Sequence, residues 1–169
     1  MGSDETVETR AYRKGVENVR IGLVLEGGGM RGVYTAGVLE YFLDEGIRFP
    51  YVVGVSAGAC SATNYLSEQK GRNRTVTIGY VNHPRYLSLG NWFRERSLFG
   101  MELLFNELPN RLEPFDYDAF YRNPANFWVV TTDAMTGEPY YREKNEAGPD
   151  SAFMDYVRAS SSLPYFSPD

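Results

Sequence analysis

The first third of the chain alternates short apolar runs with longer amphipathic stretches. The apolar run at 19–25 ends in three glycines at 27–29, which predicts a buried strand that leads into a tight turn. Apolar positions at helical spacing then predict a helix over 33–43, with Gly46 as its stop. The β-branched run at 50–55 predicts a second strand.

Small residues over 57–66 predict a second, tightly packed helix directly after the second strand. The order strand, helix, strand, helix is typical of parallel strands joined by crossover helices. The fold class expected from this pattern is α/β, with a mostly parallel central sheet.

The middle of the chain is less periodic. Residues 76–78 predict a short strand, and 101–108 predict a helix that Pro109 helps to close. A stretch between these elements is rich in aromatic and aliphatic residues and contains three arginines. We interpret this stretch as a helical cap over the sheet, with docking on a lipid surface as the alternative.

The last third predicts a hairpin and a helix. Residues 127–132 form a strand pattern, and 138–142 pair with it across the turn at 135–137. A final helix is expected over 150–158, followed by a loop at 159–169.

Composition places the chain among ordinary globular domains. It has 169 residues, 43% of them hydrophobic, with 17 Lys and Arg against 22 Asp and Glu and a net charge of −5. This length suits one domain with its own core, and the composition excludes low-complexity disorder. Because no basic excess is present, nucleic acid is not an expected partner.

The first residues and the cysteine count point to a soluble, cytoplasmic protein. Residues 1–18 read as a charged, flexible leader without a signal-peptide core, so the domain is expected over 19–169. No run approaches the length of a membrane span, although peripheral contact with a membrane is an open alternative. Cys60 is the only cysteine, which excludes an internal disulfide, and we expect it to pack in the second helix. The sequence gives no indication of the oligomeric state.

The strongest chemical signal is a G-x-S-x-G pattern from Gly54 to Gly58, placed between a strand and a helix. This context is the one that a nucleophile elbow requires, and Ser56 is the candidate nucleophile. Gly54 and Gly58 would avoid collisions with neighbouring elements at the sharp turn. A small-residue turn before a closely packed helix is the alternative interpretation.

A second glycine motif, residues 27–32, lies between the first strand and its helix. Its unhindered N–H groups could stabilise an oxyanion beside Ser56. The same letters satisfy G-x-G-x-x-G, but the acidic residue that a dinucleotide site needs about 20 residues later is missing. We therefore favour the oxyanion interpretation.

The general base is the difficult part of this hypothesis. His83 is the only histidine, and its turn-like context at Pro84 and the order of acidic residues argue against a triad role. By elimination, a carboxylate that acts directly on Ser56 remains.

With these motifs in order, residues 20–168 resemble the patatin-like phospholipase family. The resemblance rests on the glycine motif at 27–32, the elbow at 54–58 and the late segment at 159–164. It implies a three-layer α/β/α fold and lipid acyl hydrolysis through a Ser–Asp dyad, with no metal and no cofactor. It assigns the nucleophile to Ser56. It assigns the oxyanion hole to the turn formed by Gly27, Gly28, Gly29 and Met30.

One element of the family pattern is missing. The catalytic aspartate of the family precedes a glycine shortly after the late segment, and this chain contains no Asp-Gly pair. We therefore expect the chain to be the N-terminal, serine-bearing part of a longer protein, with little activity of its own. Asp133 and Asp155 are weak candidates for the base, because they read as turn and exposed-helix positions.

Arg31 admits two interpretations. It could contact a phospholipid headgroup or the anionic intermediate, or it could pair with Glu26 at the start of the helix. The expected substrate is a phospholipid or another acyl ester. The alternatives are a lipid-binding or acyl-binding module without catalysis, and a serine esterase completed by a histidine from sequence that is missing here.

Overall fold

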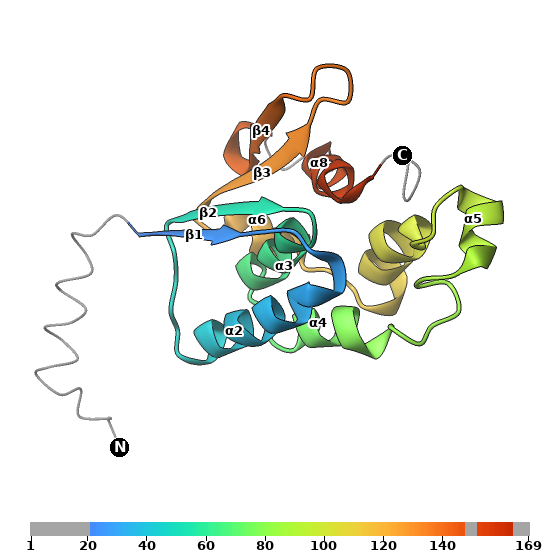
Figure 1. Ribbon diagram of the computed structural model, residues 1–169. Coiled ribbons are helices and arrows are strands. Elements are labelled where there is room, and N and C mark those ends of the chain that lie inside the picture. Colours follow the sequence, from blue (N-terminus) through green and yellow to red (C-terminus); the bar gives the residue numbers. More distant parts are fainter. Residues whose placement is uncertain (1–20, 148–151, 164–169) are drawn as a thin grey trace, which may run out of the picture.

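The computed structural model describes residues 21–147 and 152–163, and its centre is a four-stranded sheet (Figure 1). The order is β1 (Gly22–Leu25), β2 (Tyr51–Val55), β3 (Asn126–Thr132) and β4 (Pro139–Glu143). The first three strands are parallel, and β4 pairs with β3 in the antiparallel sense. The predicted leader at 1–18 lies outside the described residues.

Helices connect the parallel strands. The helix α2 (Gly32–Asp44) joins β1 to β2, and α3 (Ala57–Leu66) follows β2 directly. Both helices were predicted, the first from the spacing of its apolar residues and the second from its run of small residues. The mostly parallel sheet with its surrounding helices confirms the α/β class and is consistent with a three-layer α/β/α fold.

One face of the sheet carries the main hydrophobic core. Val52 and Phe127 are register partners, and both are fully buried. Phe153 from α8 (Ala152–Ser161) packs on Phe127, with ring centroids 5.6 Å apart. Aromatic burial of this kind contributes strongly to packing, so α8 is held against β3. This position matters because the C-terminal end of α8 reaches the elbow.

The predicted strand at 76–78 is wrong. These residues lie in η2 (Thr75–Gly79), a wide helical turn that continues α4 (Arg72–Arg74). β1 and β4 are the edge strands of the described sheet, and residues 75–79 pair with neither of them but extend the helical turn that starts at Arg72. Tertiary context overrides β-propensity here.

The helix predicted over 101–108 also continues further than expected. It runs through Pro109 as η3 (Leu103–Leu112), a segment with the wider π-type spacing. The Glu113 amide donates to the Leu108 carbonyl at 2.8 Å, five residues back. With this spacing the helix passes the proline, which lacks an N–H of its own, instead of ending at it.

Three more short helices are α5 (Leu89–Glu95), α6 (Tyr117–Arg122) and α7 (Lys144–Ala147). The sequence pattern does not predict α6 or α7, whereas α5 falls in the stretch interpreted as a helical cap. Side-chain caps begin two of them: the Asn91 amide donates to Ser88 Oγ, and the Ala119 amide donates to Asp116 Oδ1. Such caps satisfy amides that the first helical turn leaves free.

The loop predicted from 159 onward is wrong at its start, because α8 extends to Ser161. The hydroxyls of Ser161 and Ser162 donate to carbonyls four residues back, those of Val157 and Arg158. This back-bonding lets serines continue a helix that their propensity would end. The rest of the predicted loop, 164–169, lies outside the described residues. Within 21–147 and 152–163, no helix combines the length and hydropathy that crossing a bilayer demands.

Candidate active site

Ser56 stands on a strained bend between β2 and α3. Its backbone has φ 54° and ψ −125°, a combination that residues with a side chain rarely adopt. Such strain persists only where the surroundings enforce it, and it is concentrated at functional sites. The bend places Ser56 at the N-terminus of α3, where the helix dipole favours negative charge.

Two glycines create the space for this bend. A Cβ on Gly54 would lie 2.7 Å from the Cα of Ala59, and one on Gly58 would lie 2.2 Å from the Leu25 carbonyl oxygen. Neither distance is sterically possible, so α3 approaches the strands closely only because both positions lack a side chain. The predicted roles of Gly54 and Gly58 therefore have a direct structural cause.

The glycine turn after β1 lies against the nucleophile candidate. A Cβ on Gly27 would be 3.0 Å from the Cβ of Ser56 and 3.6 Å from its Oγ. Gly28 and Gly29 have φ values of 140° and 54°, which glycine adopts freely. The structure thus brings together the two motifs that lie about 25 residues apart in the sequence.

The backbone amides of this turn are available. Within the described ranges, the N–H groups of Gly27 and Gly28 donate to no other residue. Gly29 and Met30 begin the short helix η1 (Gly29–Arg31), so their amides have no partner inside it. Gly29 and Met30 also line the same cavity as Ser56. These free donors are what an oxyanion site requires.

Ser160 was not predicted as part of the site, but it holds the elbow in place. Its Oγ accepts a hydrogen bond from the Ser56 amide at 2.8 Å and donates to the Val130 carbonyl at 2.6 Å. The hydroxyl therefore ties the bend to β3 from the end of α8. It also occupies the amide of Ser56, which leaves the amide of Ala57 as the donor on the α3 side of the cavity.

A cavity of about 250 Å³ opens beside Ser56 and follows one face of α3. Its walls are mostly apolar, formed by side chains from η2, η3 and α8. Examples are Val76, Leu104, Leu108 and Val157. A narrow, mostly apolar cavity that begins at a candidate nucleophile is suited to an acyl chain.

Cys60 and Tyr86 line the same cavity without forming a second reactive site. Burial raises the pKa of the Cys60 thiol, whose Sγ lies 3.5 Å from Ser161 Oγ. Burial also raises the pKa of Tyr86, whose hydroxyl donates to Met30 Sδ at 3.7 Å. Both groups stay protonated at neutral pH, in keeping with the packing role expected for Cys60.

The histidine and the two candidate aspartates lie elsewhere. His83 Nδ1 accepts from the Arg85 amide at 3.2 Å in a turn outside the cavity. Asp133 Oδ1 accepts from the amides of Met135 and Thr136, which lowers its pKa, so it serves the hairpin turn. Asp155 is exposed on α8. Among described residues, no side chain forms a hydrogen bond with Ser56 Oγ.

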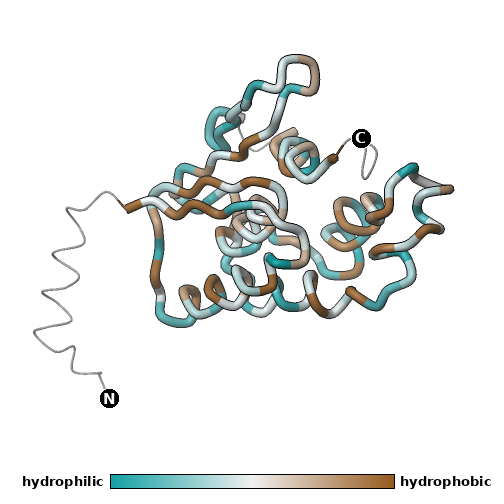
Figure 2. Tube along the Cα trace, viewed as in Figure 1, coloured by the Kyte–Doolittle hydropathy of each residue, from teal (hydrophilic) through white to brown (hydrophobic). Residues whose placement is uncertain are grey.

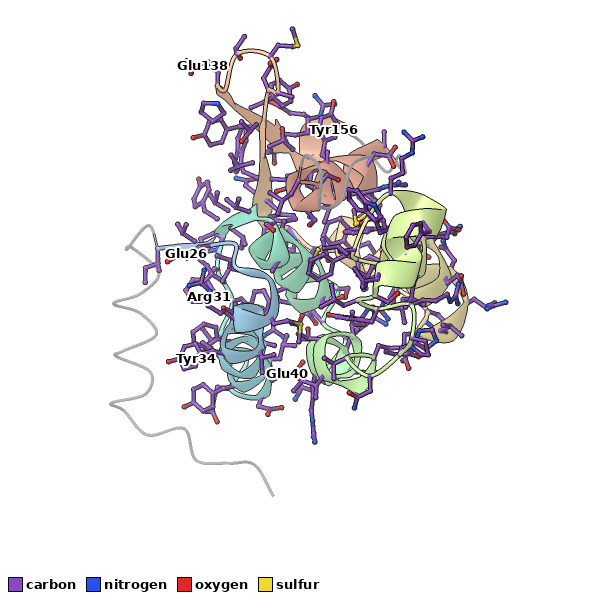
Figure 3. The ribbon with its side chains drawn as sticks, turned by 45° about the vertical axis from the view of Figure 1, so that its right-hand side comes forward. Glu26, Arg31, Tyr34, Glu40, Glu138 and Tyr156 are labelled. Atoms are coloured by element: carbon purple, nitrogen blue, oxygen red, sulfur yellow. The ribbon has the colours of Figure 1, made fainter. Side chains whose placement is uncertain are left out.

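Arg31 does not pair with Glu26. Across the described ranges its guanidinium has no ion pair; it folds over Gly28, where a Cβ would lie 3.2 Å from Nε. Figure 3 shows Glu26 and Arg31 on the side of the molecule formed by β1 and α2. The exposed arginine therefore lies beside the glycine turn without an ion-pair partner among the described residues.

A strained serine after a parallel strand, a glycine turn with free amides and an apolar cavity thus lie together in one α/β domain. The family model described as patatin-like phospholipase matches residues 23–169, and the chain belongs to this family. The family is one of lipid acyl hydrolases.

A relative in Escherichia coli (strain K12) covers nearly the whole chain. The uncharacterized protein YjjU is 27% identical over 170 residues, which is 98% of this chain. The match takes in 45% of the length of YjjU, so the chain spans less than half of that relative.

Proposed function

We propose that Ser56 is the nucleophile of a serine acyl hydrolase that cleaves lipid esters. The observation that carries this proposal is the strained Ser56 backbone at the entrance of the apolar cavity, beside the free amides of the glycine turn. Membership of the patatin-like phospholipase family supports the class of substrate.

In the proposed reaction, Ser56 Oγ attacks the ester carbonyl as a base removes its proton. The carbonyl oxygen becomes an anion, and the amides of Gly28, Gly29 and Met30 stabilise it, with the Ala57 amide as a further donor. The carbon–oxygen bond to the alcohol breaks, and the alcohol leaves with the proton. Water then attacks the acyl-enzyme, releases the fatty acid and restores the serine.

We infer that the base is an aspartate supplied by sequence that follows Asp169. Among the described residues neither His83, Asp133 nor Asp155 contacts Ser56 Oγ. The greater length of the relative YjjU supports a longer parent protein. A histidine from the same region, as in other serine esterases, is the alternative base.

The proposed enzyme touches membranes through the α5 loop, residues 85–100. Two polar side chains, Asn91 and Ser97, are fully buried inside this loop. The side-chain nitrogen Nδ2 of Asn91 donates to the carbonyls of Arg85 and Leu98. Large apolar side chains point outward instead: Leu89 is 75% exposed and Phe93 is 88% exposed. Hydrophobic positions at the outer end of this loop are visible in Figure 2.

A loop with polar side chains inside and large apolar side chains outside favours contact with an apolar surface. Arg85, one of the three arginines in the stretch considered for docking on a lipid surface, forms an ion pair with Glu107. The apolar tip therefore carries the proposed contact. Co-sedimentation with phosphatidylcholine vesicles should fall when Phe93 is changed to Ser. It should not fall when Tyr34, an 82% exposed residue of α2, is changed in the same way.

The test of the hydrolase is labelling by a fluorophosphonate probe, which reacts with activated serines. We expect labelling of the protein that includes the sequence after Asp169, and its loss in Ser56→Ala. Ser61→Ala is the matched control, because Ser61 lines the same cavity from the next turn of α3. Labelling that persists in Ser56→Ala would refute the proposal.

The isolated chain tests the inference about the base. Without the aspartate, residues 1–169 should hydrolyse nitrophenyl esters about 10³-fold more slowly than the longer protein, as for enzymes that lose a partner of the nucleophile. Equal rates would show that the base lies within these residues. Retention of lipid by both forms, without labelling, would favour a binding module.

A further inference from the structure

The far end of the cavity is polar, in contrast to its walls. Asn64, Arg72 and Asn73 line it where α3 ends and α4 begins. Arg72 Nε donates to Asn64 Oδ1 at 3.0 Å, and Asn64 Nδ2 donates to Asn73 Oδ1 at 3.0 Å. These contacts fix the guanidinium at the end of the apolar passage that begins at Ser56.

Arg72 is a buried cation, and the half-buried Glu113 carboxylate partly offsets the lowering of its pKa by burial. Only 9% of its surface is exposed, and burial lowers its pKa. Its Nη1 donates to the carbonyls of Glu113 and Pro114, which are neutral groups. In the described part of the chain Arg72 forms no ion pair, and its Nη2 has no hydrogen-bond partner. A second anion at Nη2 would offset more of the cost of burying this charge.

The length of the cavity fits a medium acyl chain. Ser56 and Asn64 are eight residues apart along α3, and a helix rises about 1.5 Å per residue, so the ends lie about 12 Å apart. An extended chain of about eight carbons, with bonds of about 1.5 Å, spans this distance together with its two end groups.

We propose that the cavity accepts acyl chains of about eight carbons that end in a carboxylate, which Arg72 binds. The proposal rests on the proposed function, because it assumes that Ser56 holds the ester end of the same chain. Oxidative cleavage of an unsaturated acyl chain is the class of reaction that supplies such a substrate. A cavity that ended in purely apolar walls would instead favour an acyl chain that ends in a methyl group.

The test is binding, which does not depend on turnover. Octanoic acid and octanedioic acid are titrated by calorimetry into the protein carrying Ser56→Ala. The second carboxylate should improve the affinity about tenfold, the effect of one charge-assisted hydrogen bond in a buried site. Arg72→Gln should abolish this preference. Arg74→Gln, at an exposed position of the same short helix, should keep it.

A second variant protects the test against misfolding of Arg72→Gln. Asn64→Asp places a carboxylate on the partner of Arg72 Nε, so it supplies an anion in direct contact with Arg72 and should also remove the preference. The melting temperature checks its fold, because this variant gains an ion pair with Arg72 but loses the hydrogen bond that Asn64 Nδ2 donates to Asn73 Oδ1. Equal affinity for the two acids, or a preference that survives both variants, would overturn the proposal.

The outcomes also separate this proposal from the proposed function. A preference for octanedioic acid without fluorophosphonate labelling at Ser56 would leave the carboxylate site standing and remove the hydrolase. Labelling at Ser56 together with equal affinities for octanoic and octanedioic acid would leave the hydrolase standing and remove the carboxylate site.

Discussion

The two glycine turns of the site use glycine for different physical reasons. At the elbow, Gly54 and Gly58 are needed for space, because a Cβ would lie within 2.7 Å of the neighbouring backbone. In the turn after β1, Gly28 and Gly29 are needed for conformation, and a Cβ on Gly29 would meet nothing within 4 Å. The elbow is therefore a packed structure that fixes a side chain. The turn after β1 is open, and the backbone amides of Gly28 and Gly29 have no hydrogen-bond acceptor among the described residues.

The largest effect should follow from filling the elbow. Gly58→Ala puts a Cβ 2.2 Å from the Leu25 carbonyl oxygen, so α3 must move away from β1. Overpacking typically costs about 1–3 kcal/mol, and we expect at least the upper value because the opposing atom is backbone. Urea denaturation measures the loss.

The matched control is Gly37→Ala in α2, where a Cβ meets nothing within 4 Å. Here alanine should raise the free energy of unfolding by about 0.5–1 kcal/mol, since glycine weakens a helix interior. Equal effects of the two substitutions would show that the close approach of α3 to β1 does not determine stability.

The contact between the two turns gives the second prediction. Gly27→Ala places a Cβ 3.0 Å from the Cβ of Ser56, so the Ser56 side chain must shift by a few tenths of an ångström. Small displacements of a reacting group can cost up to about 10²-fold in rate. We expect the rate of fluorophosphonate labelling to fall by at least about tenfold, with little change in stability because Gly27 is exposed.

Gly29→Ala separates crowding from conformation. Its left-handed φ of 54° should cost about 1–2 kcal/mol of stability, without a new contact with Ser56. A labelling rate that falls more in Gly29→Ala than in Gly27→Ala would contradict the proposed contact.

Both turns could be predicted from the sequence, since each glycine motif follows an apolar run and precedes a helical pattern. The four strands could be predicted from their short apolar, aromatic or β-branched runs, and the first two helices from apolar spacing and from a run of small residues. The segment at 76–78 could not, because its state depends on whether a neighbouring strand is available. The course of η3 through Pro109 depends on a local widening of the helix that no residue pattern announces.

The partners that complete the site come from distant positions. Ser160 reaches the Ser56 amide across 104 residues, and Arg72 meets the carbonyls of Glu113 and Pro114 across about 40. Serine and arginine are common residue types, and nothing in their spacing indicates these contacts. The late segment at 159–164 was noticed for its resemblance to a family motif, and the structure shows what Ser160 does there.

The third prediction tests whether the elbow is fixed by Ser160 as well as by its glycines. Ser160→Ala removes the link from the Ser56 amide to the Val130 carbonyl. We expect a loss of about 1–2 kcal/mol, because two partners are left unsatisfied in a partly buried place. The labelling rate should fall too, and Ser160→Thr, which keeps the hydroxyl, should restore it.

Ser162→Ala is the control, since its hydroxyl donates back to the Arg158 carbonyl, four residues earlier, at 3.1 Å. If Ser160→Ala and Ser162→Ala leave the labelling rate equally unchanged, the elbow is held by packing alone.

The smallest effect concerns a third glycine turn, at the tip of the β3–β4 hairpin. Gly137 has φ 77° and open space around it, as Gly29 does, but the amides of this turn are occupied, because Asp133 Oδ1 accepts from Met135 and Thr136. These bonds hold the pKa of Asp133 below its ordinary value of 3.8. The stabilisation is therefore present above that value and is lost as the pH falls through the lowered pKa.

Asp133→Ala should accordingly lower the melting temperature at neutral pH, and the difference from the parent should disappear in strong acid. Glu138→Gln, a change in the same hairpin at a side chain without a hydrogen bond among the described residues, should leave the pH dependence unaltered (Figure 3). A difference that persists in strong acid would mean that the carboxylate does not hold the turn. A glycine turn would then not need its amides satisfied, and free amides beside Ser56 would no longer distinguish the turn at 27–32 from an ordinary one.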